Sequence, residues 1–341
     1  MSQQDDIKVS QNNRGPSVFK SFLIGLVLAL LAREILLFTT RRSYPTHTAG
    51  AILVSGASQG IGRDAAIALA KQGFSVYAGV RKEMDAASLE SEGFDNLIPI
   101  FLDVQNSSQI QEALVTVSSS GLQFVGLINN AGVLDRSFLE SQSIEDIKWM
   151  YDVNVIGLIE LSQAFLPLLR ESKGRIVNMG SVASFLSVPG LAAYAGTKFA
   201  LRGLSDGLRR ELYALDVAVV LLEIGVVETR MARTPLRPPP AAAAAADDPA
   251  AAAVTAAYAP LARLFGREYA TDWYTTRDTD RAVLAAMTDK RPRPSYTCAG
   301  AGPAPAWLIR RLVQLLPDHL LDFFLVGPVA KFVTRLIGRK S

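Results

Sequence analysis

The chain has 341 residues, with 35 lysines and arginines against 32 acidic residues, so its formal net charge is only +3. With this balance, and without a basic stripe interleaved with aromatics, nucleic acid is not expected as a partner. The single cysteine, Cys298, excludes an intrachain disulfide. The two histidines, His47 and His319, lie at opposite ends of the chain, which argues against a metal site and against a Ser-His-Asp hydrolase.

The N-terminal region divides into a polar leader and an apolar run. Residues 1–16 are polar and are expected to be disordered. Residues 17–40 are apolar apart from Lys20 and the adjacent Arg33 and Glu34, two charges that are not expected to face each other on a helix. About 20 apolar residues span a bilayer as a helix. The run is therefore predicted to be a membrane anchor, spanning or interfacial, with a buried N-terminal helix as the alternative.

The central region, residues 50–230, alternates short β-branched runs with helical ones. The runs expected to be buried strands are "AILVSGA", "FSVYAGV", "LIPIFLDV", "VGLINNAG", "GRIVNMGSV" and "VAVVLLEIG". Helical stretches between them include "GRDAAIALAKQG" and the long "SIEDIKWMYDVNVIGLIELSQAFLPLLRES". This alternation predicts an α/β fold with a doubly wound, Rossmann-type parallel sheet in a single domain.

The pattern changes after the sixth expected strand. Residues 231–260 form a Pro/Ala-rich low-complexity insert, expected to be a flexible loop or a marginal alanine helix. Residues 261–341 end in an apolar stretch that Pro317 and Pro328 divide into short amphipathic helical pieces. This C-terminal segment is predicted to pack on the core, line a substrate entrance or contact a membrane.

A glycine-rich turn follows the first expected strand. Gly56, Gly60 and Gly62 in "SGASQGIG" have the spacing G-x-x-x-G-x-G and stand between a strand and a helix. Glycines let such a turn tighten and let the backbone approach a pyrophosphate at the positive N-terminus of the next helix. The context predicts a dinucleotide site.

A tyrosine and a lysine stand four residues apart in "YAGTKFALRG". On a helix, Tyr194 and Lys198 would share one face, where an ammonium could make a phenol a usable acid. The alternative is an ordinary amphipathic helix, with Phe199, Leu201 and Leu204 facing a core and Lys198 and Arg202 in solvent.

Together with "NNAG" at residues 129–132, Asn154 in "DVNVIG" and Ser181 in "NMGSVAS", these motifs make the chain resemble the short-chain dehydrogenase/reductase family over residues 51–229. The resemblance implies catalytic roles for Asn154, Ser181, Tyr194 and Lys198. Tyr194 would be the general acid or base, and Lys198 would lower its pKa and hold the nicotinamide ribose. Ser181 would hold the substrate oxygen, and Asn154 a water of a proton relay. Taken singly, Ser181 also suits a strand-end cap and Asn154 a capping amide.

The resemblance also implies the residues that contact the cofactor. They are Gly56, Ser58, Gln59, Gly60, Ile61, Gly62, Arg81, Asp103, Val104, Asn130, Ala131, Gly132, Tyr194, Lys198, Val227 and Thr229.

Residues at the end of the second expected strand bear on the choice between NADP(H) and NAD(H). Val80 stands where the family usually has an acidic residue for a ribose 2′-hydroxyl, and Arg81 with Lys82 follows. A guanidinium suits a 2′-phosphate, so NADP(H) is preferred and NAD(H) stays possible. Asp103 is similar to the family residue near the adenine. One departure is Ile224, which stands where the family usually has proline, and it puts the fine geometry of the nicotinamide in doubt.

The C-terminal segment is similar to the membrane-associated retinol and hydroxysteroid dehydrogenase branch. This implies a small lipophilic substrate, such as a steroid, retinoid or keto-lipid, and a membrane location with the endoplasmic reticulum as the expected compartment. Membrane orientation stays open because basic residues flank both sides of the apolar run. The resemblance also implies a homodimer or homotetramer. Two alternatives are kept, a soluble carbonyl reductase of small substrates and a non-catalytic nucleotide-binding scaffold.

Overall fold

A computed structural model describes residues 15–237, 256, 258–262, 274–301 and 304–326 of the chain. The chain divides into two compact units, Met1–Ser43 and Tyr44–Ser341. Most of the Pro/Ala-rich insert expected at residues 231–260 lies outside the described residues. Residues 1–14 of the expected leader also lie outside them.

The larger unit is built on a seven-stranded sheet in which every neighbouring pair is parallel. The strands are β1 (Ala51–Val54), β2 (Ser75–Val80), β3 (Leu97–Phe101), β4 (Phe124–Asn129), β5 (Arg175–Met179), β6 (Ala218–Ile224) and β7 (Ser295–Cys298). Their order is β3-β2-β1-β4-β5-β6-β7, so the chain winds outward in one direction from β1 and in the other from β4. A ligand crevice is expected at this reversal, beyond the carboxyl ends of the strands. The predicted fold class is confirmed.

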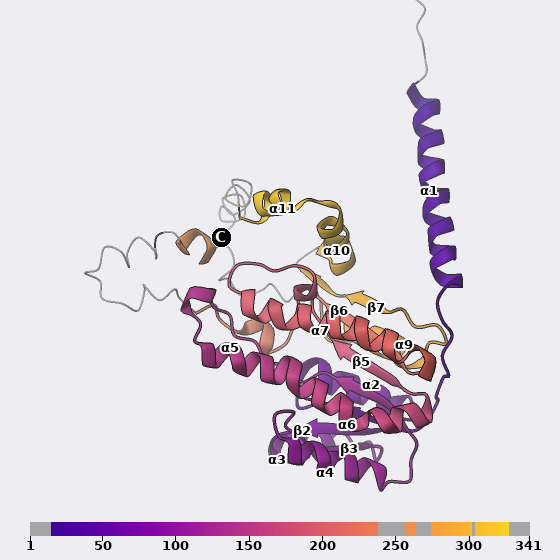
Figure 1. Cartoon of the computed structure of the whole chain (residues 1–341), viewed down its shortest axis with the longest axis vertical. Coiled ribbons are helices and arrows are strands. Elements are labelled where there is room, and N and C mark those ends of the chain that lie inside the picture. The colour runs from indigo at the N-terminus through magenta and orange to yellow at the C-terminus, as the bar shows by residue number, and fades with distance from the viewer. Residues whose placement is uncertain (1–14, 238–255, 257, 263–273, 302–303, 327–341) are drawn as a thin grey trace, which may run out of the picture. The chain divides into compact units, whose positions relative to one another are not determined.

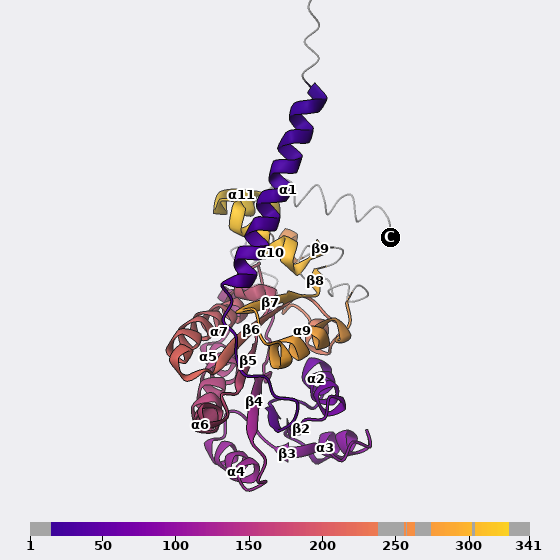
Figure 2. The ribbon, with the colours of Figure 1, turned by 90° about the vertical axis from the view of Figure 1, so that its right-hand side faces the viewer.

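Helices cover both faces of the sheet. Figure 2 shows one layer with α2, α3 and α9 and the opposite layer with α4, α6 and α7. The helices whose bounds lie within the described part of the larger unit are α2 (Gly60–Lys71), α3 (Glu83–Glu90), α4 (Ser107–Ser118), α5 (Ile144–Tyr151), α6 (Gly157–Ser172), α7 (Ala192–Glu211), α9 (Arg277–Thr288), α10 (Ala306–Leu315) and α11 (Asp318–Leu325). Short 3₁₀ turns are η1 (Leu139–Ser141), η3 (Val182–Ser184), η4 (Tyr213–Leu215) and η5 (Met231–Arg233).

The β-branched strands form the floor of two apolar cores, one on each face. On one face Ile52 and Val54 of β1 pack with Leu69 of α2. On the other, Leu53 packs with Phe165 of α6, because successive side chains of a strand point to opposite faces. A sheet buried on both faces needs continuous apolar strands, which is why the runs could be recognised in the sequence.

The long stretch after β4 is helical throughout, as predicted, and it contains a π-helical turn, η2 (Asp152–Ile156), between α5 and α6. Ser143 caps the N-terminus of α5 by accepting a hydrogen bond from the Asp146 backbone N–H at 3.0 Å. Single π turns inside helices are frequent at functional sites, and this one contains Asn154.

The C-terminal region is part of the larger unit. The short β7 was not predicted, and it extends the sheet by pairing with β6 from Leu221↔Ser295 to Ile224↔Cys298. An antiparallel pair, β8 (Gly300–Ala301) and β9 (Ala304–Pro305), then leads into α10. Figures 1 and 2 both show α10 next to β7.

In the smaller unit, α1 (Gly15–Thr39) forms one continuous helix. Arg33 and Glu34 form an ion pair at 2.6 Å, so the expectation that these neighbouring charges do not meet is wrong. Long side chains on adjacent residues reach around the helix surface. Among the described residues, two helical stretches are long and apolar enough to cross a membrane, Lys20–Thr39 and Ile144–Ser172. The second comprises α5, which packs on α7, and α6, which packs on β4, and 44% of its apolar window is buried, whereas the first has no buried part.

Candidate functional site

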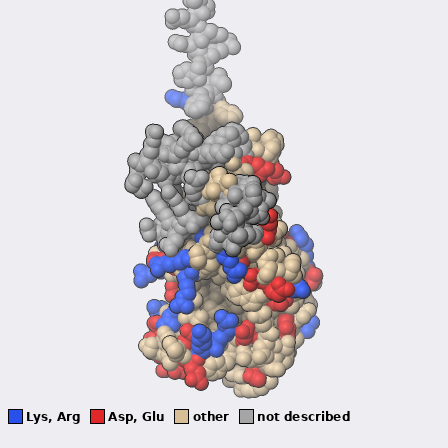
Figure 3. All heavy atoms as spheres, turned by 90° about the vertical axis from the view of Figure 1, so that its left-hand side faces the viewer, with Lys and Arg blue, Asp and Glu red and all other residues tan. Residues whose placement is uncertain are grey.

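The site is built at the carboxyl edge of the sheet, where the loops after β1, β2, β3, β4, β5 and β6 meet. Figure 3 shows that this side of the molecule is hollowed and that lysine and arginine side chains surround the hollow. A cavity of about 200 Å³ lies at the β1–β4 reversal, lined by the glycine turn and by the residues that follow β2, β3 and β4. This is the crevice that the strand order predicts.

The glycine turn is shaped by close backbone contacts. Gly56 has φ +65°, a left-handed conformation that glycine adopts without strain. A Cβ on Gly62 would lie 2.2 Å from Asn130 Nδ2 and 2.5 Å from the Gly56 carbonyl oxygen. Asn130 in turn donates hydrogen bonds from Nδ2 to the carbonyl oxygens of Ser55 and Gly56, at 3.0 and 2.9 Å. The "NNAG" loop therefore supports the turn from the neighbouring strand.

The N-terminus of α2 opens into the same crevice. Its N-cap residue, Gln59, makes no side-chain capping hydrogen bond, so the side chain leaves the first backbone N–H groups of the helix to another acceptor. Exposed N–H groups at a positive helix end fit a diphosphate. The tight turn and this helix end together fit the cofactor that the sequence implies.

The expected cofactor residues gather around two adjoining cavities. All of them line the crevice except Tyr194, Lys198 and Val227, which line the second cavity. Arg81 and Asp103 stand at the crevice wall, with 3.6 Å between their charged groups and an exposed Arg81 guanidinium. Arg230 also lines the crevice and was not predicted from the sequence. The sequence feature that could have identified Arg230 is a basic residue directly after Thr229, an expected cofactor contact.

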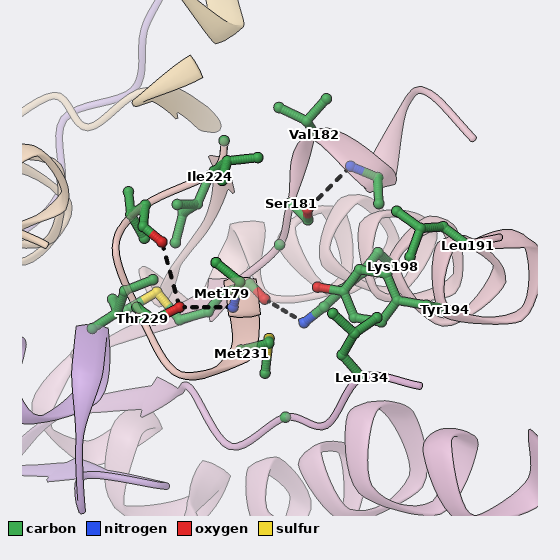
Figure 4. Close-up of a pocket in the computed structure, with 18 of the residues that line it drawn as sticks. Leu134, Met179, Ser181, Val182, Leu191, Tyr194, Lys198, Ile224, Thr229 and Met231 are labelled. Atoms are coloured by element: carbon green, nitrogen blue, oxygen red, sulfur yellow. Dashed lines mark hydrogen bonds between the residues drawn. The ribbon is translucent and has the colours of Figure 1, made fainter. Parts of the chain in front are cut away.

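The second cavity has a volume of about 250 Å³ and mostly apolar walls. It shares walls with the crevice, because the same residues line both, namely Ile61, Asn130, Gly132, Thr229 and Met231. Its remaining apolar lining comes from Leu134, Met179, Val182, Leu186, Val188, Leu191, Ile224 and Ile309, among others. Figure 4 shows Ser181, Tyr194 and Lys198 among the side chains around this cavity.

Tyr194 and Lys198 lie one turn apart on α7, and both are buried. The Lys198 Nζ donates a hydrogen bond to the Met179 carbonyl oxygen at 2.9 Å and lies 5.8 Å from the centre of the Tyr194 ring. Burial lowers the pKa of Lys198 from 10.5 to about 8. The lysine is thus poised to change its charge near neutral pH, which is typical of functional groups.

The ordinary amphipathic interpretation of this helix is confirmed for Leu201, which is buried, but it is wrong for Lys198, Phe199 and Leu204. Lys198 is only 5% exposed, whereas Phe199 is 46% and Leu204 40% exposed. The helix therefore presents its Tyr–Lys face to the interior and two large apolar side chains to the outside.

Ser181 stands at the end of β5 and caps η3. Its Oγ accepts a hydrogen bond from the Ala183 backbone N–H at 3.1 Å, and its own N–H donates to the Ser184 Oγ at 3.1 Å. The capping interpretation is therefore right, and it is compatible with a role in the cavity. A hydroxyl that accepts one bond still has its O–H and a second lone pair to offer.

Asn154 lies behind the cavity, fully buried in the π turn. Its Oδ1 accepts from the Val133 N–H at 2.7 Å, and its Nδ2 donates to the Val133 carbonyl oxygen at 2.9 Å and to Thr197 Oγ1 at 3.1 Å. Thr197 lies between Tyr194 and Lys198 on α7. Asn154 thus joins the loop after β4 to the helix that carries the Tyr–Lys pair.

The segment after β6, where Ile224 stands in the position expected for proline, is held by β7. Ile224 pairs with Cys298 of β7, and the Gly225 N–H donates to the Cys298 carbonyl oxygen at 2.9 Å. These sheet contacts fix the turn from the neighbouring strand. Among the described residues, no group of three or more His, Cys, Asp or Glu side chains is placed to hold a metal ion.

Comparisons with known proteins agree with this geometry. The family model described as short chain dehydrogenase matches residues 50–238. The mitochondrial D-beta-hydroxybutyrate dehydrogenase of Rattus norvegicus is 37% identical over 199 residues, which cover 54% of this chain and 58% of that enzyme. The chain thus matches less than two thirds of the length of this curated relative.

Solved structures show the same fold. A short chain dehydrogenase from Burkholderia cenocepacia, solved in complex with NADP, has a TM-score of 0.63 at 24% identity, covering 83% of this chain and all of that one (100%). Serine dehydrogenase from Escherichia coli is 34% identical with a TM-score of 0.50, covering 52% of this chain and 82% of that one. A serine dehydrogenase in its closed form was solved with NADP+.

Proposed function

Because the chain belongs to the short-chain dehydrogenase family, we propose that it is an NADP(H)-dependent oxidoreductase that interconverts a ketone or aldehyde with its alcohol on a lipophilic, membrane-partitioned substrate. One observation carries the proposal. Tyr194 and Lys198 share one face of α7 at a cavity that adjoins the glycine-turn crevice. For proton and hydride transfer, a Tyr–Lys pair must lie between a substrate and a dinucleotide. The apolar cavity would hold the substrate, and the crevice would hold the dinucleotide.

The crevice residues would hold the cofactor. The glycine turn and the N-terminus of α2 would bind the diphosphate, and Asp103 with Val104 would lie at the adenine. Thr229 and Val227 would contact the nicotinamide, which supplies or accepts the hydride when the cofactor is bound.

Tyr194 would deliver a proton to the substrate oxygen in reduction and remove it in oxidation. A free phenol has a pKa of about 10, so it needs a neighbouring cation to act near neutral pH. Lys198 supplies that charge below its pKa of about 8. The hydroxyl of Ser181 would donate a hydrogen bond to the same substrate oxygen and stabilise the charge that develops there.

Asn154 would position this pair. Its hydrogen bonds to Val133 and Thr197 tie the loop beside the cofactor to α7. A water held at the π turn would complete a proton path from Lys198 to solvent, in keeping with the family resemblance.

The preference for NADP(H) rests on Val80 and Arg81. The carboxyl end of β2 carries no acid to bind a 2′-hydroxyl, and the exposed Arg81 guanidinium lies at the crevice wall. A 2′-phosphate would compete with Asp103 for this guanidinium, which binds phosphate in a bidentate fork.

The lipophilic substrate is inferred from the cavity and from α1. Mostly apolar walls favour a steroid, retinoid or keto-lipid over a polar small molecule. In α1, exposed apolar side chains such as Phe22, Leu28 and Ile35 would be covered by lipid. The proposed location is a membrane, with the endoplasmic reticulum as the compartment to examine first.

The test is oxidation of NADPH and of NADH by the detergent-solubilised full chain, across steroid ketones, retinal and long-chain keto-lipids. The proposal expects turnover with NADPH and an apolar carbonyl. Turnover only of small polar carbonyls, together with unchanged kinetics in a soluble variant lacking the residues before Arg41, would establish a soluble carbonyl reductase instead. Cofactor binding without turnover of any carbonyl would leave a nucleotide-binding scaffold.

A further inference from the structure

A buried carboxylate stands beside the substrate cavity and outside the catalytic set. Glu223, the residue before Ile224 at the end of β6, is 0% exposed. Arg202 of α7 donates to its Oε1 at 2.7 Å, and Arg310 of α10 donates to its Oε2. A buried charge is costly unless partners neutralise it. Here two guanidiniums, one from α7 and one from α10, neutralise one carboxylate.

Arg310 connects α10 to the sheet. Besides Glu223 on β6, the same Nη1 donates to Ser295 Oγ on β7 at 2.9 Å. The outer side of α10 is exposed, with Trp307 at 58% and Leu315 at 77%. On the inner side, the Ala306 N–H donates to the Ala299 carbonyl oxygen at 2.8 Å, and Arg310 supplies the ionic link from α10 to β6.

The residue next to Arg310 reaches the substrate cavity. Ile309 lines it, as does Gly300 of β8. The backbone N–H of Val226 donates to the Gly300 carbonyl oxygen at 2.6 Å, which joins the C-terminal segment to the loop after β6. A stretch far along the chain thereby forms one wall of the cavity.

We propose that the Glu223–Arg310 ion pair positions α10 as the outer wall of the substrate cavity, and that Ile309 on this wall limits the length of the apolar substrate. The inference rests on the proposed function. Arg310 is a positioning residue, because it acts through Ile309 and does not line the cavity itself.

The geometry makes a specific variant informative. In Arg310→Gln, Glu223 keeps Arg202 as a partner, so the carboxylate is not left wholly uncompensated and the sheet remains intact. Only the hold on α10 is loosened. Arg311 is the next residue on the same helix and is exposed, so Arg311→Gln is the matched control for loss of one positive charge.

The experiment measures KM and kcat for a series of straight-chain aldehydes, from short to long, and the NADPH Kd by fluorescence. For Arg310→Gln we expect KM to change about tenfold for long aldehydes, with the short ones, kcat and the NADPH Kd unaltered. Arg310→Lys should restore most of the wild-type KM for long aldehydes, and Arg311→Gln should have the wild-type KM throughout the series. An equal effect on short and long aldehydes, or an altered NADPH Kd, would overturn the inference.

A double-mutant cycle tests whether Arg310 acts through Ile309. Ile309→Ala should change the preferred chain length, and adding Arg310→Gln should change it little further. Independent, additive effects would contradict the inference. Failure of the proposed function is distinguished because the wild type would then turn over only the short aldehydes or none. Thermal shifts produced by the same aldehydes with NADP+ present would still report whether Arg310 sets chain-length preference.

Discussion

Replacing Lys198 with methionine should stabilise the protein while removing its activity. Burial lowers the pKa of Lys198 from 10.5 to about 8. At about 1.36 kcal/mol per pKa unit, keeping this ammonium charged inside the fold costs about 3 kcal/mol at pH 7. Lys198→Met removes that cost and loses the hydrogen bond to the Met179 carbonyl oxygen, worth about 1 kcal/mol. The net gain is about 2 kcal/mol, or roughly 4–8 °C in Tm.

The sign of the pH dependence is fixed by the depressed pKa of a base. The unfolded chain binds the proton more tightly, so the cost is full below pH 8 and fades as pH rises toward 10.5. Thermal unfolding of the cofactor-free, detergent-solubilised full chain between these pH values should show the Tm gap closing as pH rises. The exposed Lys148→Met serves as a control with a Tm change near zero. A Lys198→Met protein less stable than the wild type at pH 7, or a gap independent of pH, would refute the reasoning.

Three other substitutions give distinct readouts. In a fluorescence titration, Arg81→Ala should raise the NADPH Kd about tenfold and leave the NADH Kd unchanged. Equal increases in both Kd values would show that Arg81 does not bind the 2′-phosphate. Gly62→Ala should weaken NADPH binding and lower Tm because its Cβ would lie 2.2 Å from Asn130 Nδ2, whereas Gly203→Ala, with nothing within 4 Å, should be tolerated. Asp280→Asn should raise stability at pH 7 by about 1–2 kcal/mol, since burial and Asp64 raise the pKa of Asp280 to about 6. Protonated Asp280 carries no such cost, so this gain should vanish near pH 4, and a gain that persists there would be contrary to the assignment.

The core of the fold was predictable because its signals are local. Each strand that is buried on both faces must be continuously apolar, and the glycines at 56, 60 and 62 stand in the strand-turn-helix context that gives their spacing meaning. The π turn at Asp152–Ile156 had no such signal. The residues on both sides of it have helical periodicity, and the extra backbone residue is visible only in three dimensions.

The candidate site was predictable where residue type and spacing carry the chemistry. The spacing of Tyr194 and Lys198 suggested a pair, and the other motifs of the resemblance supported it, but the burial of Lys198 and the exposure of Phe199 run against hydropathy. Hydropathy describes average behaviour and does not report the contacts of one side chain, such as the hydrogen bond from Lys198 to the Met179 carbonyl oxygen. The role of Ile309 could not be foreseen, because it depends on β7 pairing with β6 and on the distant partner of Glu223.

The account depends most on Tyr194 as the group that exchanges a proton with the substrate oxygen. The direct measurement is single-turnover NADPH oxidation by Tyr194→Phe with an accepted apolar carbonyl, alongside its NADPH Kd, with Tyr151→Phe on α5 as the control. We expect the Kd to stay within about twofold and the rate to fall at least about a hundredfold, as befits loss of a general acid. A Tyr194→Phe enzyme that binds NADPH and reduces the carbonyl at the wild-type rate would contradict the account.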